Sequence, residues 1–228
     1  MKKTYLFLFF AIATLFTISM SSCSETDNSV EEYPNWQATN ESYFNNVYTA
    51  AQKAVNDGDA SWKLIRSWSL LESVATKPTD YVVVEVKNGG TGSGCPLYTD
   101  SVKVHVRARL LPSTSYAKGY VFAQSFSGDE VNPNVDAPMT LGVAQGTYVP
   151  NGLSTALQQM HIGDHWIVTV PYQLGYGTTT YTTPVVEAYS TLLYDVTLVG
   201  YFRKTNTASA PSIDGNTTSG ADGYWVYE

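Results

Sequence analysis

The pattern that most constrains the fold is a regular alternation of apolar and polar residues over residues 101–111. The apolar positions are Val102, Val104, Val106, Ala108 and Leu110, and the positions between them hold Lys103, His105, Arg107 and Arg109. Successive side chains of a β-strand point to opposite faces, so we expect a strand with one buried and one solvated face. Such strands are typical of antiparallel sheets that pack one face on a core.

Shorter segments around this strand predict the rest of the architecture. Further strands are expected at residues 81–86, 120–126, 138–141, 166–170 and 191–201. One short helix is expected over residues 151–160, with an apolar side made of Leu153, Ala156, Leu157 and Met160. Five or six strands and one short helix predict an α+β fold, in which an antiparallel sheet wraps on the helix.

The segment before the sheet has a helical period over residues 33–71. Its apolar residues recur at steps of three and four, as in Tyr43, Val47, Ala50, Ala51 and Ala54. The sequence Asn56-Asp57-Gly58-Asp59 is expected to end that helix. Three tryptophans, Trp36, Trp62 and Trp68, are too apolar for a free linker. Residues 33–77 are therefore predicted to form an N-terminal helical arm that packs on the main domain.

The first 22 residues have the parts of an export signal. Lys2 and Lys3 form a basic start, and the apolar run after them is too short for a good membrane span. Ser19-Met20-Ser21-Ser22-Cys23 resembles the lipobox of bacterial lipoproteins, which implies cleavage before Cys23 and lipidation of that cysteine. The alternative is ordinary secretory cleavage that leaves Cys23 free. The polar residues 23–32 are expected to be a tether.

The residue after the cysteine bears on location, because in lipoproteins of two-membrane bacteria it takes part in sorting. Ser24 stands there instead of an aspartate, which favours the outer membrane. The sequence therefore predicts a lipid-anchored protein of the cell envelope, with the membrane as a partner through Cys23. Whether it faces the periplasm or the cell surface stays open.

Charge and cysteine usage exclude several classes of function. The net charge is −7 and the sequence has no basic cluster, so a nucleic-acid partner is not expected. Beyond Cys23 only Cys95 remains, which allows no internal disulfide and no cysteine-type metal site. His161 and His165 are separated by Gly163, which breaks a helix between them, so no metal pair is expected. Neither a metal nor a cofactor is predicted.

Four blocks in the second half of the sequence resemble one known family. The first two are Asp100-Ser101-Val102-Lys103-Val104-His105-Val106-Arg107-Ala108-Arg109-Leu110 and Gly119-Tyr120-Val121-Phe122-Ala123-Gln124-Ser125. The third runs from Gly152 to Gly177 and contains Ala156-Leu157, Met160, Gly163, Pro171 and Tyr176, and the fourth is Ser190-Thr191-Leu192-Leu193-Tyr194-Asp195-Val196. In this order the blocks resemble the FKBP-type peptidyl-prolyl cis/trans isomerases. The resemblance implies an FKBP-like domain over residues 78–202. The polar residues after it predict a flexible tail over 203–228, whose aromatic end, Tyr224-Trp225-Val226-Tyr227, is a candidate to dock on the folded part.

The resemblance also implies a set of site residues. Phe122 stands for the aromatic wall of the pocket, and Tyr176 for the phenol that binds a substrate carbonyl; these two are the expected catalytic residues. The expected substrate-binding residues are Val106, Val149, Leu153, Val185, Val186 and Tyr194. The polar loop 178–183, which contains Tyr181, is a candidate flap over the site, and otherwise a mobile loop.

Four positions depart from the family pattern. Ala123 stands where an aspartate usually follows the phenylalanine, and Val106 where a tyrosine usually lines the pocket. Leu153 replaces a tryptophan that many members place under the proline ring. Pro150 falls, in an alignment without gaps, at the residue whose backbone N–H typically holds a ligand carbonyl, and proline has no N–H. These departures predict reduced activity.

Three functions remain open on this basis. The first is a peptidyl-prolyl isomerase that assists the folding of exported proteins and binds proline-containing polypeptides. The second is an FKBP-like binding or chaperone module that has lost useful catalysis. The third is a structural lipoprotein of an envelope complex that uses the arm as its contact. The arm is also a possible route to a homodimer.

Overall fold

The computed structural model describes residues 30–204, 218–220 and 223–227. The predicted signal peptide, the lipidation site Cys23 and most of the tether lie outside these residues. The described residues from Glu32 onward form one compact unit. The predicted boundary between an arm ending at residue 77 and a domain beginning at residue 78 falls within that unit and stays a prediction.

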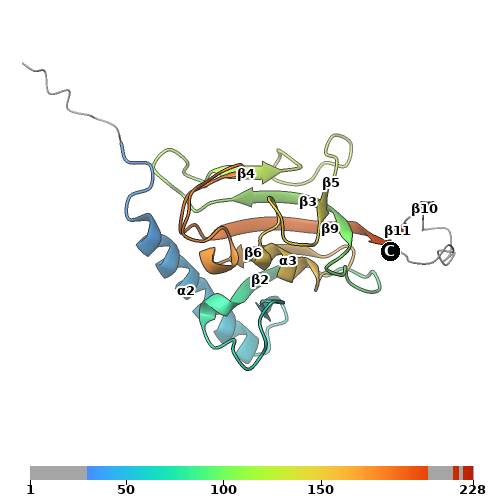
Figure 1. Ribbon diagram of the computed structural model, residues 1–228, viewed down its shortest axis with the longest axis horizontal. Helices are drawn as coiled ribbons and strands as arrows, with labels where there is room; N and C mark the ends of the chain where they lie inside the picture. Colours follow the sequence, from blue (N-terminus) through green and yellow to red (C-terminus); the bar gives the residue numbers. More distant parts are fainter. Residues whose placement is uncertain (1–29, 205–217, 221–222, 228) are drawn as a thin grey trace, which may run out of the picture. The chain divides into compact units, whose positions relative to one another are not determined.

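An antiparallel sheet forms the body of the molecule, as expected (Figure 1). Its central strands are β2 (Tyr81–Asn88), β3 (Ser101–Arg109), β4 (Val121–Gln124), β5 (Met139–Gly142), β6 (His165–Val170) and β9 (Leu192–Lys204). Hydrogen bonding runs in the order β2-β6-β9-β3, and β3 also pairs with β4 and with β5. The alternation that predicted β3 is borne out, because Val102, Val104, Val106 and Ala108 are each at most 2% exposed.

The helix α3 (Asn151–Leu157) lies against the buried face of this sheet, where it packs on β2 and β6. It is shorter than the expected 151–160, although Met160 is still fully buried. The close approach of α3 to the sheet depends on Gly152. A Cβ added there would lie 2.3 Å from Cγ1 of Val170 and 3.1 Å from Cγ1 of Val82. A residue without a side chain therefore sets the distance between helix and sheet.

Substitution of Gly152 by alanine is expected to destabilise the protein by about 1–3 kcal/mol, because overpacking a tight interior forces side chains and backbone to shift. Chemical denaturation of the variant measures the loss. Gly142→Ala is the matched control, because a Cβ there would meet nothing within 4 Å. Equal stabilities of the two variants would contradict close packing at Gly152.

The N-terminal arm differs from its prediction in one respect. A helix, α2 (Trp36–Asn56), is present and ends where expected. Residues 62–66, however, form a strand, β1 (Trp62–Arg66), which pairs with β2 at the edge of the sheet. The expectation that the helical pattern continues to residue 71 is therefore wrong: after the turn at Gly58 the chain joins the sheet.

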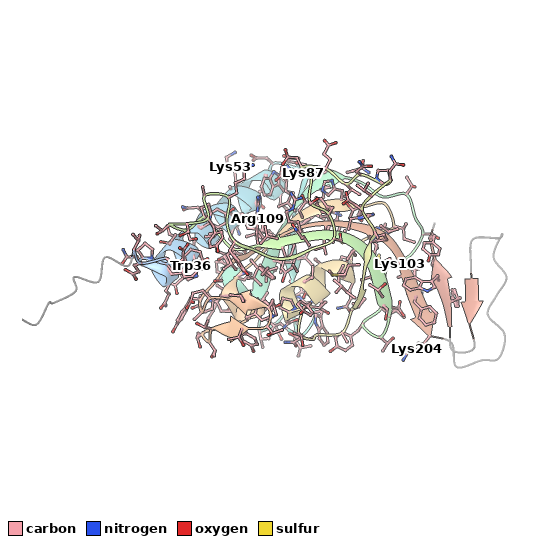
Figure 2. All side chains as sticks on the ribbon, turned by 90° about the horizontal axis from the view of Figure 1, so that it is seen from above. Trp36, Lys53, Lys87, Lys103, Arg109 and Lys204 are labelled. Atoms are coloured by element: carbon pink, nitrogen blue, oxygen red, sulfur yellow. The ribbon has the colours of Figure 1, made fainter. Side chains whose placement is uncertain are left out.

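The arm packs on the sheet at two places. The middle of α2 covers the outer face of β2, where Phe44 and Ala51 contact Val83. Near the start of α2, Trp36 enters the main core and is 7% exposed, with its indole N–H donating to Oγ of Ser190 at 2.8 Å. Figure 2 labels Trp36 near the start of the helix. Trp36 thus links the arm to the loop before β9.

Asn40 reinforces this junction although it is polar and fully buried. Its side-chain amide donates to the carbonyl of Trp36 at 2.8 Å, and its Oδ1 accepts the backbone N–H of Thr191 at 2.7 Å. The hydroxyl of Thr191 donates in turn to the carbonyl of Asn40 at 3.2 Å. Because buried polar groups need partners, this set of bonds fixes the register of the helix against β9.

Short elements complete the fold. They are η1 (Pro78–Asp80), η2 (Tyr172–Leu174), β7 (Tyr181–Thr182), β8 (Val185–Val186), β10 (Thr218–Gly220) and β11 (Gly223–Val226). The strands β7 and β8 pair with each other as a small separate hairpin. At the C-terminus the structure differs from the expected flexible tail, since β9 continues to Lys204 and β11 pairs with it.

The aromatic C-terminal end is held by Lys103, which projects from the outward face of β3 (Figure 2). The ammonium group lies 4.5 Å from the ring centroid of Trp225 and donates to the hydroxyl of Tyr227 at 2.7 Å. Cation–π contacts of this kind add modest stability at exposed sites. The C-terminal aromatic residues are therefore part of the folded unit.

Candidate active site

Phe122 is aimed by an irregularity in β4. Ala123 pairs with Ala108 and Val121 pairs with Arg109, so Phe122 is an extra residue between two successive pairs of the β3–β4 ladder. Such a bulge disturbs the alternation of side chains and can redirect one of them. The ring of Phe122 is partly buried and packs on the main core.

Two aromatic rings contact that of Phe122, and a third contacts one of these two. Its centroid lies 6.3 Å from that of Tyr176 and 6.0 Å from that of Tyr194, both in edge-to-face geometry with interplanar angles of 86° and 88°. The ring of Tyr181, in the β7–β8 hairpin, lies with its centroid 5.0 Å from that of Tyr176. Edge-to-face contacts are among the preferred arrangements of aromatic pairs. The expected catalytic residues Phe122 and Tyr176 therefore lie together.

The phenol of Tyr176 is a protonated donor. It donates to the backbone carbonyl of Thr147 at 2.8 Å. Burial is the main cause that raises its pKa well above the ordinary value for tyrosine, and the nearby phenols of Tyr148 and Tyr181 raise it further. Ionisation is thereby disfavoured, so the group offers an O–H donor at neutral pH.

The expected apolar pocket residues separate into two groups. Four aliphatic side chains belong to the main core and are at most 3% exposed: Val106, Val149, Leu153 and Val186. Tyr194 is buried with them at 1%. Val185 is 50% exposed and lies outside this core, because the two valines of β8 point to opposite faces of the hairpin.

Two of the departures from the family pattern, Pro150 and Ala123, remove polar groups at this site. Pro150 stands directly before the first residue of α3 and carries no N–H, while the N–H of Val149 donates to the carbonyl of Gly146 at 3.2 Å. The Ala123 position provides no carboxylate beside Phe122. The backbone before the helix thus offers a ligand fewer donors than an ordinary residue at position 150 would.

A cavity of about 290 Å³ opens beside Tyr176. Its lining residues are Gln145, Gly146, Thr147, Pro150, Gly175, Tyr176 and Tyr181. One wall therefore carries the phenol of Tyr176, and another carries the loop whose carbonyl that phenol binds. This volume is at the lower end of the range for small-ligand sites.

Some features of the site were not foreseeable from residue types. The carbonyl of Thr147 is a backbone group and leaves no signal in the sequence. The bulge that aims Phe122 depends on pairing with β3. Tyr181 was marked only as part of a possible flap, and its ring contact with Tyr176 supports a place at the mouth of the site.

A second cavity, of about 240 Å³, lies on the opposite face of the sheet and includes His165 and Asp195. Nε2 of His165 lies 2.7 Å from Oδ1 of Asp195. In the part of the chain that the structure describes, no three His, Cys, Asp or Glu side chains are grouped to hold a metal. None of the helices among these residues is long and apolar enough to span a membrane.

Comparison with known protein families gives one match, and it covers most strands of the sheet. Residues 95–199 match the family described as FKBP-type peptidyl-prolyl cis-trans isomerase. This range contains β3 to β8, α3 and more than half of β9, and with them every expected pocket residue. No curated protein matches the sequence.

Two solved structures are similar to the chain. One is a peptidyl-prolyl cis-trans isomerase from Pseudomonas syringae pv. tomato, with 18% identity, a TM-score of 0.42, and coverage of 68% of this chain and 92% of that one. The other contains the three FKBP domains of wheat FKBP73, with 21% identity, a TM-score of 0.43, and coverage of 61% and 50%. Over residues 95–199, the chain is thus similar to the FKBP-type peptidyl-prolyl cis-trans isomerases.

Proposed function

We propose that the protein accelerates cis/trans isomerisation of X–Pro bonds in the pocket formed around Phe122, and thereby assists the folding of exported polypeptides. The observation that carries the proposal is the cluster of Phe122, Tyr176 and Tyr194, which meets a cavity at the Tyr176 side. A site of this composition is apolar and aromatic, with a phenol as its polar group.

The chemistry needs no nucleophile. Rotation about a peptide bond faces a barrier of about 18–20 kcal/mol because resonance gives the C–N bond partial double-bond character. The twisted amide has lost that resonance and is less polar than the planar one. An apolar pocket that excludes water therefore stabilises the twisted state relative to the planar state, which lowers the barrier.

Tyr176 would hold the substrate in place. Its hydroxyl binds the carbonyl of Thr147 in the free protein. A substrate carbonyl entering the cavity would take over this hydrogen bond, so the donor is exchanged between two carbonyls and is never left unpaired. Because burial keeps the phenol protonated, the exchange does not require a change of ionisation.

The expected rate is lower than the pocket's aromatic content alone would predict. Pro150 supplies no backbone N–H, and Ala123 supplies no carboxylate. Each lost bond to a desolvated carbonyl costs roughly 1–3 kcal/mol, which is about a 5- to 150-fold loss. The pocket would then rely on desolvation and on Tyr176.

Replacement of Tyr176 by phenylalanine tests this proposal. It keeps the ring beside Phe122 and removes the donor. We expect kcat/KM for an X–Pro peptide to fall about 5- to 150-fold, which corresponds to the loss of one bond to a desolvated carbonyl, roughly 1–3 kcal/mol. A protease-coupled isomerisation assay on parent and variant measures the ratio.

The matched control is Tyr148→Phe, which removes a 45% exposed phenol from the same loop region. It is expected to leave kcat/KM unchanged. Equal losses in both variants, or none in Tyr176→Phe, would argue against a substrate contact at Tyr176.

The proposal extends to location and partners. The export signal and the lipobox-like sequence support a protein held in the cell envelope, in the outer membrane, by a lipid on Cys23. Its clients would be proline-containing segments of polypeptides in that compartment. A homodimer through the N-terminal arm is part of the same proposal, with α2 as the element that would provide the contact.

A second candidate function has specific support. The absent N–H of Pro150 and the absent carboxylate at Ala123 fit an FKBP-like module that binds proline-containing segments without accelerating their isomerisation. Peptide binding by the protein without any rate acceleration would favour this module over the enzyme.

A further inference from the structure

The turn that carries Tyr176 is held by two residues that do not line the cavity. The backbone carbonyl of Tyr172 accepts the N–H of Gly175 at 3.0 Å and the N–H of Gly177 at 2.9 Å, so a single carbonyl brackets Tyr176 on both sides. The carbonyl of Gly177 in turn accepts the N–H of Tyr189 at 2.9 Å. The direction of the Tyr176 side chain therefore depends on where Tyr172 and Tyr189 lie.

Tyr189 has a backbone conformation that is unfavourable for a residue with a side chain. Its φ angle is 62°, in the left-handed region that favours glycine. Its ring packs edge-to-face on that of Tyr172, with the centroids 5.3 Å apart. Such a conformation persists only where the surrounding structure imposes it. The neighbours of Tyr189 in the chain must therefore be held firmly.

Helix α2 of the N-terminal arm holds those neighbours. The two residues that follow Tyr189 are both bonded to it: Ser190 accepts the indole N–H of Trp36 at 2.8 Å, and the N–H of Thr191 donates to Oδ1 of Asn40 at 2.7 Å. All four bonded residues are buried, so solvent offers no replacement partner. The arm thereby fixes the backbone immediately after Tyr189.

The same helix also reaches Tyr172. The phenol of Tyr172 donates to Oε1 of Glu41 at 3.2 Å, and Glu41 is the residue after Asn40. Burial and this hydrogen bond raise the pKa of the Tyr172 phenol, which therefore stays a donor at neutral pH. One face of α2 thus contacts both supports of the Tyr176 turn.

We propose that α2 positions the phenol of Tyr176 for its substrate. Asn40 acts through Tyr189, and Glu41 acts through Tyr172. The inference rests on the proposed function, in which Tyr176 is the donor to the substrate carbonyl. Neither Asn40 nor Glu41 lines the cavity beside Tyr176, so both are positioning residues. The arm is then a working part of the site in addition to a segment that precedes the domain.

The first test measures the turn itself, in the free full-length protein. Amide hydrogen exchange by NMR reports how often the N–H groups of Gly177 and Tyr189 open. In Asn40→Ala these two amides are expected to exchange about 5- to 150-fold faster relative to the amides of β6, which corresponds to the loss of one buried hydrogen bond.

The second test asks whether the effect on the rate passes through Tyr176. We expect Asn40→Ala to lower kcat/KM for an X–Pro peptide about 2- to 150-fold, the range of couplings within a hydrogen-bonded network. The double variant with Tyr176→Phe should lose little more than Tyr176→Phe alone, because the phenol through which Asn40 acts is already gone. A residue that only stabilises the fold would give losses that multiply.

Glu41 gives a second variant at a half-buried position, in case Asn40→Ala does not fold. Glu41→Ala should speed exchange at Gly177, whereas Glu41→Gln should restore the parental values because its amide oxygen still accepts from Tyr172. Ala51→Gly is the matched control, since Ala51 lies buried on the same helix against Val83. It should lower the melting temperature without a selective change in exchange or in kcat/KM.

Three results would overturn the inference. They are unchanged exchange of the two amides in the folded variants, losses that multiply with Tyr176→Phe, and an equal selective effect in Ala51→Gly. Failure of the proposed function is distinguishable, because the parent protein would then not accelerate isomerisation at all. The exchange measurement, which needs no substrate, would in that case decide alone whether α2 holds the turn.

Discussion

Replacement of Trp36 by alanine is expected to lower the free energy of unfolding by about 3–5 kcal/mol, the usual cost of deleting a buried Trp or Phe side chain. The indole lies in the main core at 7% exposure and donates to Ser190 at 2.8 Å. Its removal leaves a cavity, and the hydroxyl of Ser190 keeps only its bond to the carbonyl of Glu187. Urea denaturation measures the loss, because the midpoint and slope of the transition give the free energy of unfolding.

Trp68→Ala is the matched control for this variant. Trp68 is 43% exposed and contacts Tyr98, with the rings tilted and their centroids 4.4 Å apart. Its loss is expected to cost about 1 kcal/mol, in keeping with a single aromatic contact at the surface. Equal destabilisation by the two substitutions would contradict the view that the arm is built into the core through Trp36.

Replacement of Phe122 by alanine is expected to reduce kcat/KM for X–Pro isomerisation about 30- to 700-fold. The ring makes edge-to-face contacts with both Tyr176 and Tyr194. Loss of these contacts and of the apolar wall amounts to about 2–4 kcal/mol, from aromatic pairing and area burial together. The protease-coupled assay gives the rate, and circular dichroism shows whether the variant is folded.

The neighbouring Val121 provides the control for Phe122. Its side chain is 36% exposed and lies on the same short strand. Val121→Ala should therefore retain the parental kcat/KM. A folded Phe122→Ala variant with parental activity would move the site away from the three-ring cluster.

The fold was predictable wherever a segment carries its own period. The alternation in β3 and the apolar side of α3 follow from local patterns, and tertiary packing agrees with them. β1 could not be recognised, because Trp62–Arg66 is only partly buried and shows no clean alternation. Its strand conformation depends on pairing with β2, which is a tertiary effect that overrides local preference.

The C-terminal strand was missed for a related reason. Gly223 is the first residue of β11, and a Cβ there would lie 2.3 Å from the carbonyl oxygen of Arg203. In the sequence such a glycine indicates flexibility, whereas in the structure it permits close approach to β9. The aromatic residues after it are then held by Lys103.

The site was predictable in its membership more than in its geometry. The residue types around Phe122, Tyr176 and Tyr194 follow from the resemblance of the sequence blocks. The exposure of Val185, the bulge at Phe122 and the bond from Tyr176 to Thr147 depend on how strands pair and loops close.

The central claim is that the pocket around Phe122 catalyses isomerisation of X–Pro bonds. NMR exchange spectroscopy on a proline-containing peptide, with the folded protein at a small fraction of the peptide concentration, tests it most directly. Uncatalysed exchange takes tens to hundreds of seconds at 25 °C. We predict exchange cross-peaks between cis and trans signals that appear with the protein and are lost in Phe122→Ala. Binding shifts without such cross-peaks from a folded parent protein would contradict the claim.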